Sequence, residues 1–213
     1  LQRPASLGAD LVMHSGTKYL DGQGRVMAGA LCGSAELITG KFAPVMRTAG
    51  MVLSPFNAWV VLKGLETLSV RVKAHCQNAL TVAQWLEAQP NVARVYYPGL
   101  PSHPQHALAL RQMGGLGGGV VTFEVKGEGA EQLQRRAFHV IDSCSWLSIA
   151  TNLGDTKTIV SHPATTSHGR LTEEQRMAAG MSQGVIRVAV GLEHPQDVMA
   201  DLAHGLDGCG VLN

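Results

Sequence analysis

The sequence has few charged residues. Lys, Arg, Asp and Glu together make up 15% of its 213 residues, against about a quarter in an average soluble protein. The formal net charge is +1, and no block of like charges occurs along the chain. A nucleic-acid-binding protein normally carries a basic stripe, so this composition argues against nucleic acid as a partner. The low charge also indicates that other polypeptide covers part of the surface.

Long apolar runs and paired cysteines are lacking too. No apolar run reaches the roughly 18 residues of a membrane span, and the first residues lack the basic-then-apolar order of a signal peptide. The scattered cysteines form no CxxC pair, which argues against a zinc site or a redox motif. Reduced thiols in a cytoplasmic protein are favoured over a disulfide. The residues concerned are Cys32, Cys76, Cys144 and Cys209.

The chain does not begin with Met. Its first four residues, Leu1 to Pro4, are typical of the middle of a connection, and an expected strand follows closely. The 45% hydrophobic content is enough for one or two globular domains with real cores. We expect the chain to be the later part of a longer polypeptide.

The first part of the chain predicts two strands and then a long helix. Ser54 is a suitable N-cap and Pro55 suits the first helical position. From there to about residue 88 the chain has no further Pro and only Gly64 as a glycine. The other expected elements are strands at 9–13 and 26–32, a turn at 21–25, a short helix at 36–42 and a loop at 47–53.

Strands and helices alternate through the second part. This alternation predicts an α/β sandwich-type domain. The expected strands are 92–96, 119–125, 140–141, 147–150, 159–160 and 185–190. The expected helices are 106–113, 130–138, one capped by Thr172, and 195–206.

A lysine flanked by small hydroxyl residues ends the first expected strand. A desolvated lysine such as Lys18 is suited to forming a Schiff base with a carbonyl cofactor. The hydroxyls of Ser15 and Thr17 are good phosphate ligands, and Gly16 keeps the backbone accessible. Pyridoxal 5′-phosphate, which has both an aldehyde and a phosphate, would satisfy the whole group. The alternative is a surface lysine in an ordinary Ser/Thr turn.

Two further residues are candidates for substrate binding. Arg187 lies in an apolar strand pattern, and a guanidinium there needs an anionic partner because it cannot discharge. It could clamp a substrate carboxylate, form a structural salt bridge, or face water at a sheet edge. Asn152 follows an expected strand and could orient a carboxylate or a Schiff base, although Asn in this position more often forms a turn.

Two other patterns do not indicate a metal site or a nucleotide-binding site. His162 and His168 have no acidic or thiol partner at metal-ligand spacing, so we expect structural histidines. The glycine-rich run 114–119 precedes a strand instead of opening a helix after one, which does not match a nucleotide-binding loop. We interpret it as a flexible turn.

Several segments together resemble one family, the Cys/Met-metabolism pyridoxal-phosphate enzymes. The similarity covers essentially all 213 residues in the right order. The resembling segments are the cofactor-lysine motif (7–22), the interdomain helix (54–68), the substrate loop (152–168) and the carboxylate-binding segment (184–193).

The resemblance implies a fold and a division into domains. The fold would be α/β, of the fold-type I PLP-dependent transferase class. Residues 1–65 would be the end of the large cofactor domain, and residues 66–213 the smaller C-terminal α/β domain. An interdomain helix at about 55–88 would join them.

The resemblance also implies roles for the candidate residues. Lys18 would be the Schiff-base lysine and proton carrier, and Ser15 and Thr17 would contact the cofactor phosphate. Arg187 would bind the substrate α-carboxylate. Asn152 stands where many relatives carry Ser and would contact the substrate.

Asn152, with Gly16 and the segment 22–25, makes the chain most similar to the O-succinylhomoserine sulfhydrylases of that family. The implied reaction is a γ-replacement in methionine biosynthesis: sulfide replaces the succinate of O-succinyl-L-homoserine and gives homocysteine. The alternatives within the family are cystathionine γ-synthase, O-acetylhomoserine sulfhydrylase and methionine γ-lyase. In another class, the chain could be a non-catalytic assembly module.

The chain departs from the family in what it does not contain. The family's Asp for the pyridine nitrogen lies just upstream of the segment matching Leu1 to Pro4, and its ring-stacking Tyr, Gly-Met phosphate loop and Tyr-x-Arg pair lie further upstream. We therefore expect these 213 residues alone to bind the cofactor poorly and not to turn over. The expected assembly is a homotetramer, or an association with the missing N-terminal half.

Overall fold

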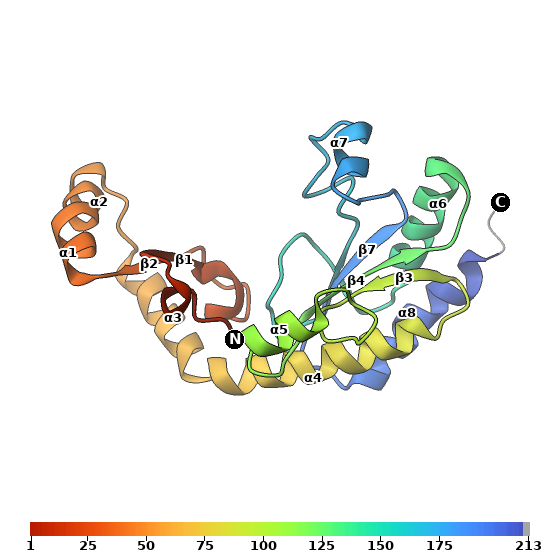
Figure 1. Cartoon of the computed structure of the whole chain (residues 1–213), viewed down its shortest axis with the longest axis horizontal. Coiled ribbons are helices and arrows are strands. Elements are labelled where there is room, and N and C mark those ends of the chain that lie inside the picture. Colours follow the sequence, from red (N-terminus) through yellow and green to blue (C-terminus); the bar gives the residue numbers. More distant parts are fainter. Residues whose placement is uncertain (211–213) are drawn as a thin grey trace.

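The computed structural model describes residues 1–210. A two-stranded sheet lies toward the N-terminal end and a five-stranded sheet is built from the C-terminal part. Helices α3 (Pro55–Glu66) and α4 (Leu68–Glu87) follow one another beneath the two sheets and connect them (Figure 1). The expected α/β class is confirmed.

The two-stranded sheet carries the segment that leads to Lys18. Strand β1 (Leu11–Ser15) pairs antiparallel with β2 (Gly29–Gly33), and Ser15 lies opposite Gly29. The π-helical turn η2 (Gly16–Leu20) follows β1 directly. Both strands were expected from the sequence, β1 two residues and β2 three residues earlier than they begin.

A helical arm follows β2. It consists of α1 (Ala35–Leu37), η3 (Ile38–Phe42) and α2 (Ala43–Ala49). The expected helix at 36–42 is confirmed, but the expected loop at 47–53 is wrong for its first three residues, which are helical. The helix ends only at Gly50, whose φ of 72° is the left-handed conformation that glycine adopts at helix C-termini.

The single long helix expected from Ser54 is in fact two helices. Ser54 caps the first as expected, because its side chain accepts a hydrogen bond from the Asn57 amide. Thr67, with φ −109° and ψ 1°, separates α3 from α4. Arg71 donates to the Gly64 carbonyl and to the Thr67 hydroxyl at this break, so side-chain bonds replace the regular helical ones. The domain boundary predicted at residue 65 lies beside the break and stays a prediction.

The five-stranded sheet has three antiparallel pairs and one parallel pair. Arg187 lies opposite Thr122 on one side and Ser161 on the other. The strand predictions for these segments are confirmed, with slightly different ends. The order is β3 (Val92–Tyr96), β4 (Val120–Val125), β7 (Val185–Ala189), β6 (Ile159–Ser161) and β5 (Ser148–Ile149), with β5 parallel to β6.

Helices α4 and α6 (Gly129–Asp142) pack against this sheet, and α8 (Pro195–Cys209) packs against both helices. The strand expected at 140–141 is wrong, because Val140 and Ile141 belong to α6 and are buried. A Cβ on Gly205 of α8 would lie 2.5 Å from the Val140 Cα, so α6 and α8 pack closely there. Val140 and Ile141 are therefore buried as part of a helix face and not as part of a strand. The remaining helices are α5 (His106–Gln112) and α7 (Glu173–Ala178), with Thr172 as the N-cap of α7 as expected.

The remaining observations concern membrane-spanning helices, cysteines, metal ligands and the histidine that we expect to be structural. Among the helices of residues 1–210, none combines the length and apolarity of a bilayer span. All four cysteines are free. Within the same residues, no group of three His, Cys, Asp or Glu side chains comes together as metal ligands. His162 is buried and its two ring nitrogens bond to Thr165 and to the Gln183 carbonyl, as expected of a structural histidine.

Candidate active site

The turn after β1 places Lys18. The amides of Gly16 and Thr17 both donate to the Ala28 carbonyl, at 2.8 and 3.3 Å. A Cβ on Gly16 would lie 2.7 Å from the Ala28 Cβ, so only glycine lets the turn close against the neighbouring segment. Lys18 itself has φ −93° and ψ −129°, outside the helical region. The backbone of the turn thus departs from helical geometry at the lysine, although the Lys18 carbonyl still accepts from the Gly22 amide at 2.9 Å.

The two hydroxyl residues beside Lys18 differ in their surroundings. The Thr17 hydroxyl accepts a hydrogen bond from the Ala28 amide at 3.1 Å and lies 3.4 Å from the Ala28 carbonyl, to which it donates. The single proton of this hydroxyl is therefore engaged in a long bond, and a phosphate oxygen would have to accept it in place of the Ala28 carbonyl. The Ser15 side chain is exposed. Their role as phosphate ligands stays a prediction.

Lys18 is held by an amide rather than by a carboxylate. Its Nζ donates to Asn152 Oδ1 at 2.5 Å, and the bond is partly buried. The ion pairs found within residues 1–210 all join other residues. The ammonium of Lys18 therefore sits beside a neutral acceptor, 134 residues away in the sequence.

Arg187 reaches the same loop from the five-stranded sheet. Its Nη2 donates to the carbonyls of Thr151 at 2.8 Å and Asn152 at 3.4 Å. Its Nε is buried and has no hydrogen-bond partner among residues 1–210. Burial lowers the pKa of Arg187. The described ion pairs do not include Arg187, so the salt-bridge alternative has no support and a free donor remains for an anion.

Asn152 joins the two cations. Its side chain receives the bond from Lys18, and its backbone carbonyl receives one from Arg187. Two residues on, Gly154 has φ +77°, and a Cβ there would lie 2.8 Å from the Tyr19 Cγ. The loop of Asn152 therefore rests on the residue that follows Lys18. The structure brings together the three predicted residues Lys18, Asn152 and Arg187.

The sequence analysis missed a group of buried side chains behind Lys18. Tyr19 lies edge-on to His75, with 5.4 Å between ring centres. Burial, and to a smaller extent the neighbouring Cys76, raises the pKa of Tyr19 to about 12. Arg71, only 7% exposed, donates to the Tyr19 carbonyl at 3.0 Å. The available signal was the four-residue spacing of Arg71 and His75, two polar residues on one face of a helix.

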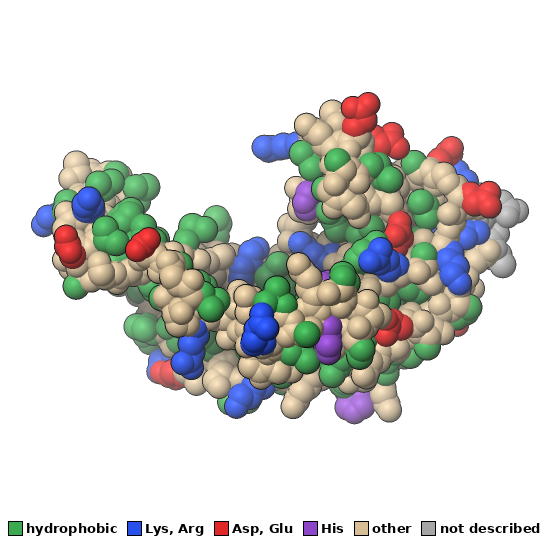
Figure 2. Space-filling model, in the orientation of Figure 1, with side chains coloured by type: hydrophobic (Ala, Val, Ile, Leu, Met, Phe, Trp, Pro, Cys, Tyr) green, Lys and Arg blue, Asp and Glu red, His purple; other side chains and the backbone are tan. Residues whose placement is uncertain are grey.

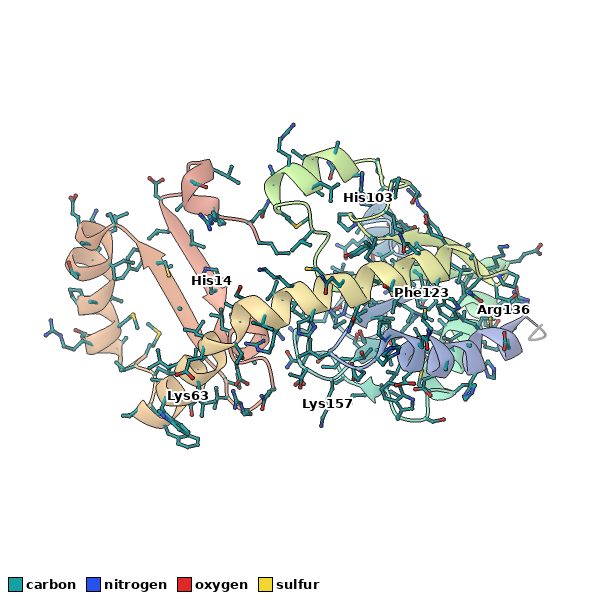
Figure 3. The ribbon with its side chains drawn as sticks, turned by 90° about the horizontal axis from the view of Figure 1, so that it is seen from below. His14, Lys63, His103, Phe123, Arg136 and Lys157 are labelled. Carbon is teal, nitrogen blue, oxygen red and sulfur yellow. The ribbon has the colours of Figure 1, made fainter. Side chains whose placement is uncertain are left out.

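Lys18 and Arg187 together provide an amine that can react and a guanidinium that can bind an anion. Lys18 supplies a primary amine without an ion-pair partner among the described residues, and Arg187 supplies a guanidinium with a free buried N–H. An amine of this kind can attack a carbonyl or carry a proton. A guanidinium of this kind can bind a carboxylate or a phosphate. Figure 3 shows α4 beginning near the end of β1, the strand of the labelled His14, and extending toward the five-stranded sheet, which contains the labelled Phe123.

Comparison with known proteins gives consistent matches. A family model described as Cys/Met metabolism PLP-dependent enzyme matches residues 1–207. An O-succinylhomoserine sulfhydrylase of Pseudomonas aeruginosa is 56% identical over 206 residues, covering 97% of this chain and 49% of that protein. An L-methionine gamma-lyase of Porphyromonas gingivalis is 46% identical over 206 residues, covering 96% and 50%.

Solved structures agree on the fold. The crystal structure of cystathionine gamma synthase from Xanthomonas oryzae pv. oryzae, in complex with cystathionine, matches with a TM-score of 0.91 at 37% identity. The match covers 100% of this chain and 54% of that one. The chain thus spans about half the length of the relatives it matches.

Proposed function

This chain belongs to the family of Cys/Met metabolism PLP-dependent enzymes, and we propose that Lys18, Asn152 and Arg187 are its part of the active site. One observation carries the proposal. The Lys18 amine and the Arg187 guanidinium converge on Asn152 from the two sheets, and neither forms an ion pair among the described residues. A structural role alone would leave two cations without counter-charge, which is an unfavourable arrangement for partly buried groups.

The residues present fit pyridoxal phosphate. The cofactor needs a primary amine for its aldehyde and donors for its phosphate. Lys18 would hold it through Nζ, whose present partner is a neutral amide oxygen that a ligand can displace. The exposed Ser15 hydroxyl would donate to the phosphate, and the Thr17 hydroxyl would do so by turning its proton away from the Ala28 carbonyl, 3.4 Å away, together with groups outside this chain. The orphaned buried Nε of Arg187 is a donor left for a carboxylate.

Each residue would then have a distinct task during the reaction. When bound, pyridoxal phosphate supplies an electron sink for negative charge at the substrate carbon next to the amino group. Lys18 Nζ would accept and return protons, and Asn152 Oδ1, which lies 2.5 Å from it in this structure, would orient that nitrogen whenever it is free of the cofactor. Arg187 would fix the substrate by its α-carboxylate. The two carbonyls bound to Nη2 hold the guanidinium plane in position.

The reaction we propose for the whole protein is a γ-replacement. Sulfide would displace succinate from O-succinyl-L-homoserine to give homocysteine, with a small amino acid and sulfide as substrates. The support is the 56% identity to a sulfhydrylase over nearly the whole chain, against 46% to a γ-lyase. Cystathionine γ-synthase, O-acetylhomoserine sulfhydrylase and methionine γ-lyase activities remain alternatives, because one scaffold supports them all.

We also propose that further polypeptide completes the site, either as the N-terminal half or through a homotetramer. Large apolar side chains are exposed over the helical arm and α3, an extent that normally marks an interface. Figure 2 shows hydrophobic side chains gathered on that arm, and a hollow between it and the five-stranded sheet. Between residues 43 and 66, the side chains of this kind that are more than half exposed are Val45, Met51, Val52, Phe56, Trp59 and Leu62. We expect the 213 residues alone to bind the cofactor weakly and to show no turnover.

Two experiments test the proposal. The first adds pyridoxal phosphate to the purified chain, reduces with borohydride and maps the modified peptide by mass spectrometry. Modification at Lys18, lost in Lys18→Arg while Lys73→Arg keeps it, is the expected result. Absence of modification at Lys18 at millimolar cofactor would favour the assembly-module alternative.

The second experiment measures turnover of the longer protein that carries this chain. The succinyl ester is compared with the acetyl ester, and sulfide with cysteine as acceptor. Preference for the succinyl ester with sulfide is expected. Preference for cysteine, or elimination from methionine, would assign one of the alternative reactions instead.

A further inference from the structure

One face of α4 carries three polar side chains that bind the backbone of other segments. Arg71, His75 and Asn78 are spaced by four and three residues, so they lie along one side of the helix. We infer that these three are positioning residues, which set the placement of Lys18 relative to Arg187. The inference rests on the proposed function in one respect, that Lys18 and Arg187 are the groups being positioned.

Arg71 fixes the Lys18 end. Its Nη1 donates to the Tyr19 carbonyl at 3.0 Å, its Nη2 to the Gly64 carbonyl at 2.7 Å, and its Nε to the Thr67 hydroxyl at 3.0 Å. The fork of the guanidinium thus ties the turn after Lys18 to the break between α3 and α4. A Cβ on Gly22 would lie 2.2 Å from Nη1, so the loop after Tyr19 also packs directly on this group. Three fixed acceptors suit the planar fork of arginine and not the single ammonium of lysine.

His75 joins both ends. It is fully buried, and its Nδ1 lies 2.7 Å from the Val190 carbonyl, just past the strand of Arg187. Since a carbonyl only accepts, Nδ1 carries the proton in this bond. The ring also meets Tyr19 edge-on. Burial lowers the pKa of His75, which favours the neutral ring, and its Nε2 has no hydrogen-bond partner in the described part of the chain.

Asn78 fixes the Arg187 end. Its Nδ2 donates to the carbonyls of Gly191 at 3.1 Å and Glu193 at 3.0 Å. The Glu193 carboxylate in turn accepts from the Thr158 amide at 2.6 Å and hydroxyl at 2.8 Å. Thr158 comes immediately before β6, the strand next to that of Arg187. Asn78 therefore holds the loop that follows β7. Through Glu193 it also holds the segment that precedes β6.

The helix between these side chains sets their spacing. Seven residues of α-helix rise by about 10 Å, and a regular helix does not shorten or lengthen appreciably. The bound carbonyls lie at segment ends, where they need donors from elsewhere. A second link runs in parallel, because the Thr156 amide donates to the Gly22 carbonyl at 2.9 Å and the Leu192 amide to the Thr156 carbonyl at 2.8 Å. Loss of one α4 side chain should therefore loosen one end without unfolding the chain.

Hydrogen exchange followed by mass spectrometry tests this inference on the chain itself. Arg71→Met should raise exchange at least tenfold in the peptide 15–25, where the amides of Asp21 and Gly22 are hydrogen-bonded. Asn78→Ala should raise it in the peptide 189–195 instead. The matched control is Lys73→Met, an exposed position on the same helix, which should stay within twofold everywhere. A uniform rise along the chain, or no rise in the named peptide, would overturn the inference.

A chemical readout separates positioning from simple stabilisation. Labelling of Lys18 by pyridoxal phosphate and borohydride, per folded molecule by circular dichroism, should slow about tenfold in Arg71→Met and stay within twofold in Asn78→Ala. If Arg71→Met does not fold, Arg71→Lys replaces it, and it should still slow labelling because one ammonium cannot serve three acceptors. Labelling at the wild-type rate in the folded variant overturns the inference. If wild-type Lys18 is not labelled, the proposed function fails, and the exchange experiment still decides the positioning role.

Discussion

Gly64→Ala should destabilise this protein, although alanine is the better helix former. In an exposed helix interior the change is worth about 1 kcal/mol in favour of alanine. Here a Cβ would lie 2.2 Å from the Leu20 carbonyl oxygen, 2.7 Å from the Asp21 carbonyl oxygen and 2.9 Å from the Asp21 Cα. These are backbone atoms of the segment that follows Lys18, and they must move by about 1 Å to reach normal contact distance.

The cost of the close contact is larger than the gain in helix propensity. Overpacking a tight contact costs about 1–3 kcal/mol, and displaced backbone places this case at the upper end. The expected net loss is about 2 kcal/mol, which lowers the melting temperature of a chain of this size by about 4–8 °C. Because the displaced segment carries the lysine, the rate of Lys18 labelling should fall as well.

The assay is urea and thermal unfolding of the purified variants, with Lys18 labelling alongside. Gly40→Ala is the matched control. Gly40 also lies in a helical segment, but a Cβ there would meet no atom of the described residues within 4 Å. That variant should be as stable as the wild type or gain up to about 1 kcal/mol. If Gly64→Ala gains stability as Gly40→Ala does, the close contact between α3 and the turn after Lys18 does not exist as described.

Three further predictions concern other groups. Asp201 is 2% exposed and accepts hydrogen bonds from the amides of residues 145–147. Asp201→Ala should therefore lower the free energy of unfolding by about 3 kcal/mol in urea titrations. A loss below about 1 kcal/mol would contradict this prediction. Burial depresses the pKa of His75 below its ordinary value of about 6.5, so its contribution to stability is present above that pH and is lost as the pH falls. His75→Gln should therefore lose less melting temperature than wild type between pH 7.5 and 5.5, whereas the exposed control His204→Gln should follow wild type. In the longer protein, Arg187→Met should raise the KM for the amino acid about 100-fold, because a buried donor to a carboxylate is lost; an unchanged KM would place the carboxylate elsewhere.

Most strands and helices were predictable because their patterns are local. Alternating β-branched residues identified β4, and cap residues identified the starts of α3 and α7. The failures have tertiary causes. Val140 and Ile141 have a strand-like sequence, but they pack against α8 from a helix. The break at Thr67 depends on Arg71, whose hydrogen bonds to this segment no local pattern reveals.

The residues of the candidate site also fall into two groups, those that the sequence revealed and those that only the structure revealed. Lys18 and Arg187 were identified from sequence because a cation placed in an apolar strand pattern needs a chemical reason wherever it folds. Asn152 was identified with them, but its bond to Lys18 was not, since the two are 134 residues apart. Arg71, His75 and Asn78 were missed because each looks like an ordinary polar residue on a helix. Their function depends on which carbonyls lie opposite them.

The sequence by itself determined the chemistry available to this protein: an amine beside hydroxyls, a strand arginine, and the family in which both occur. Those properties belong to side chains and short segments, so they are readable without a fold. Only the tertiary structure decided that the amine and the guanidinium meet at Asn152, and that neither forms an ion pair within residues 1–210. Distances between segments far apart in the chain follow from packing, and here that packing runs along the rigid length of α4.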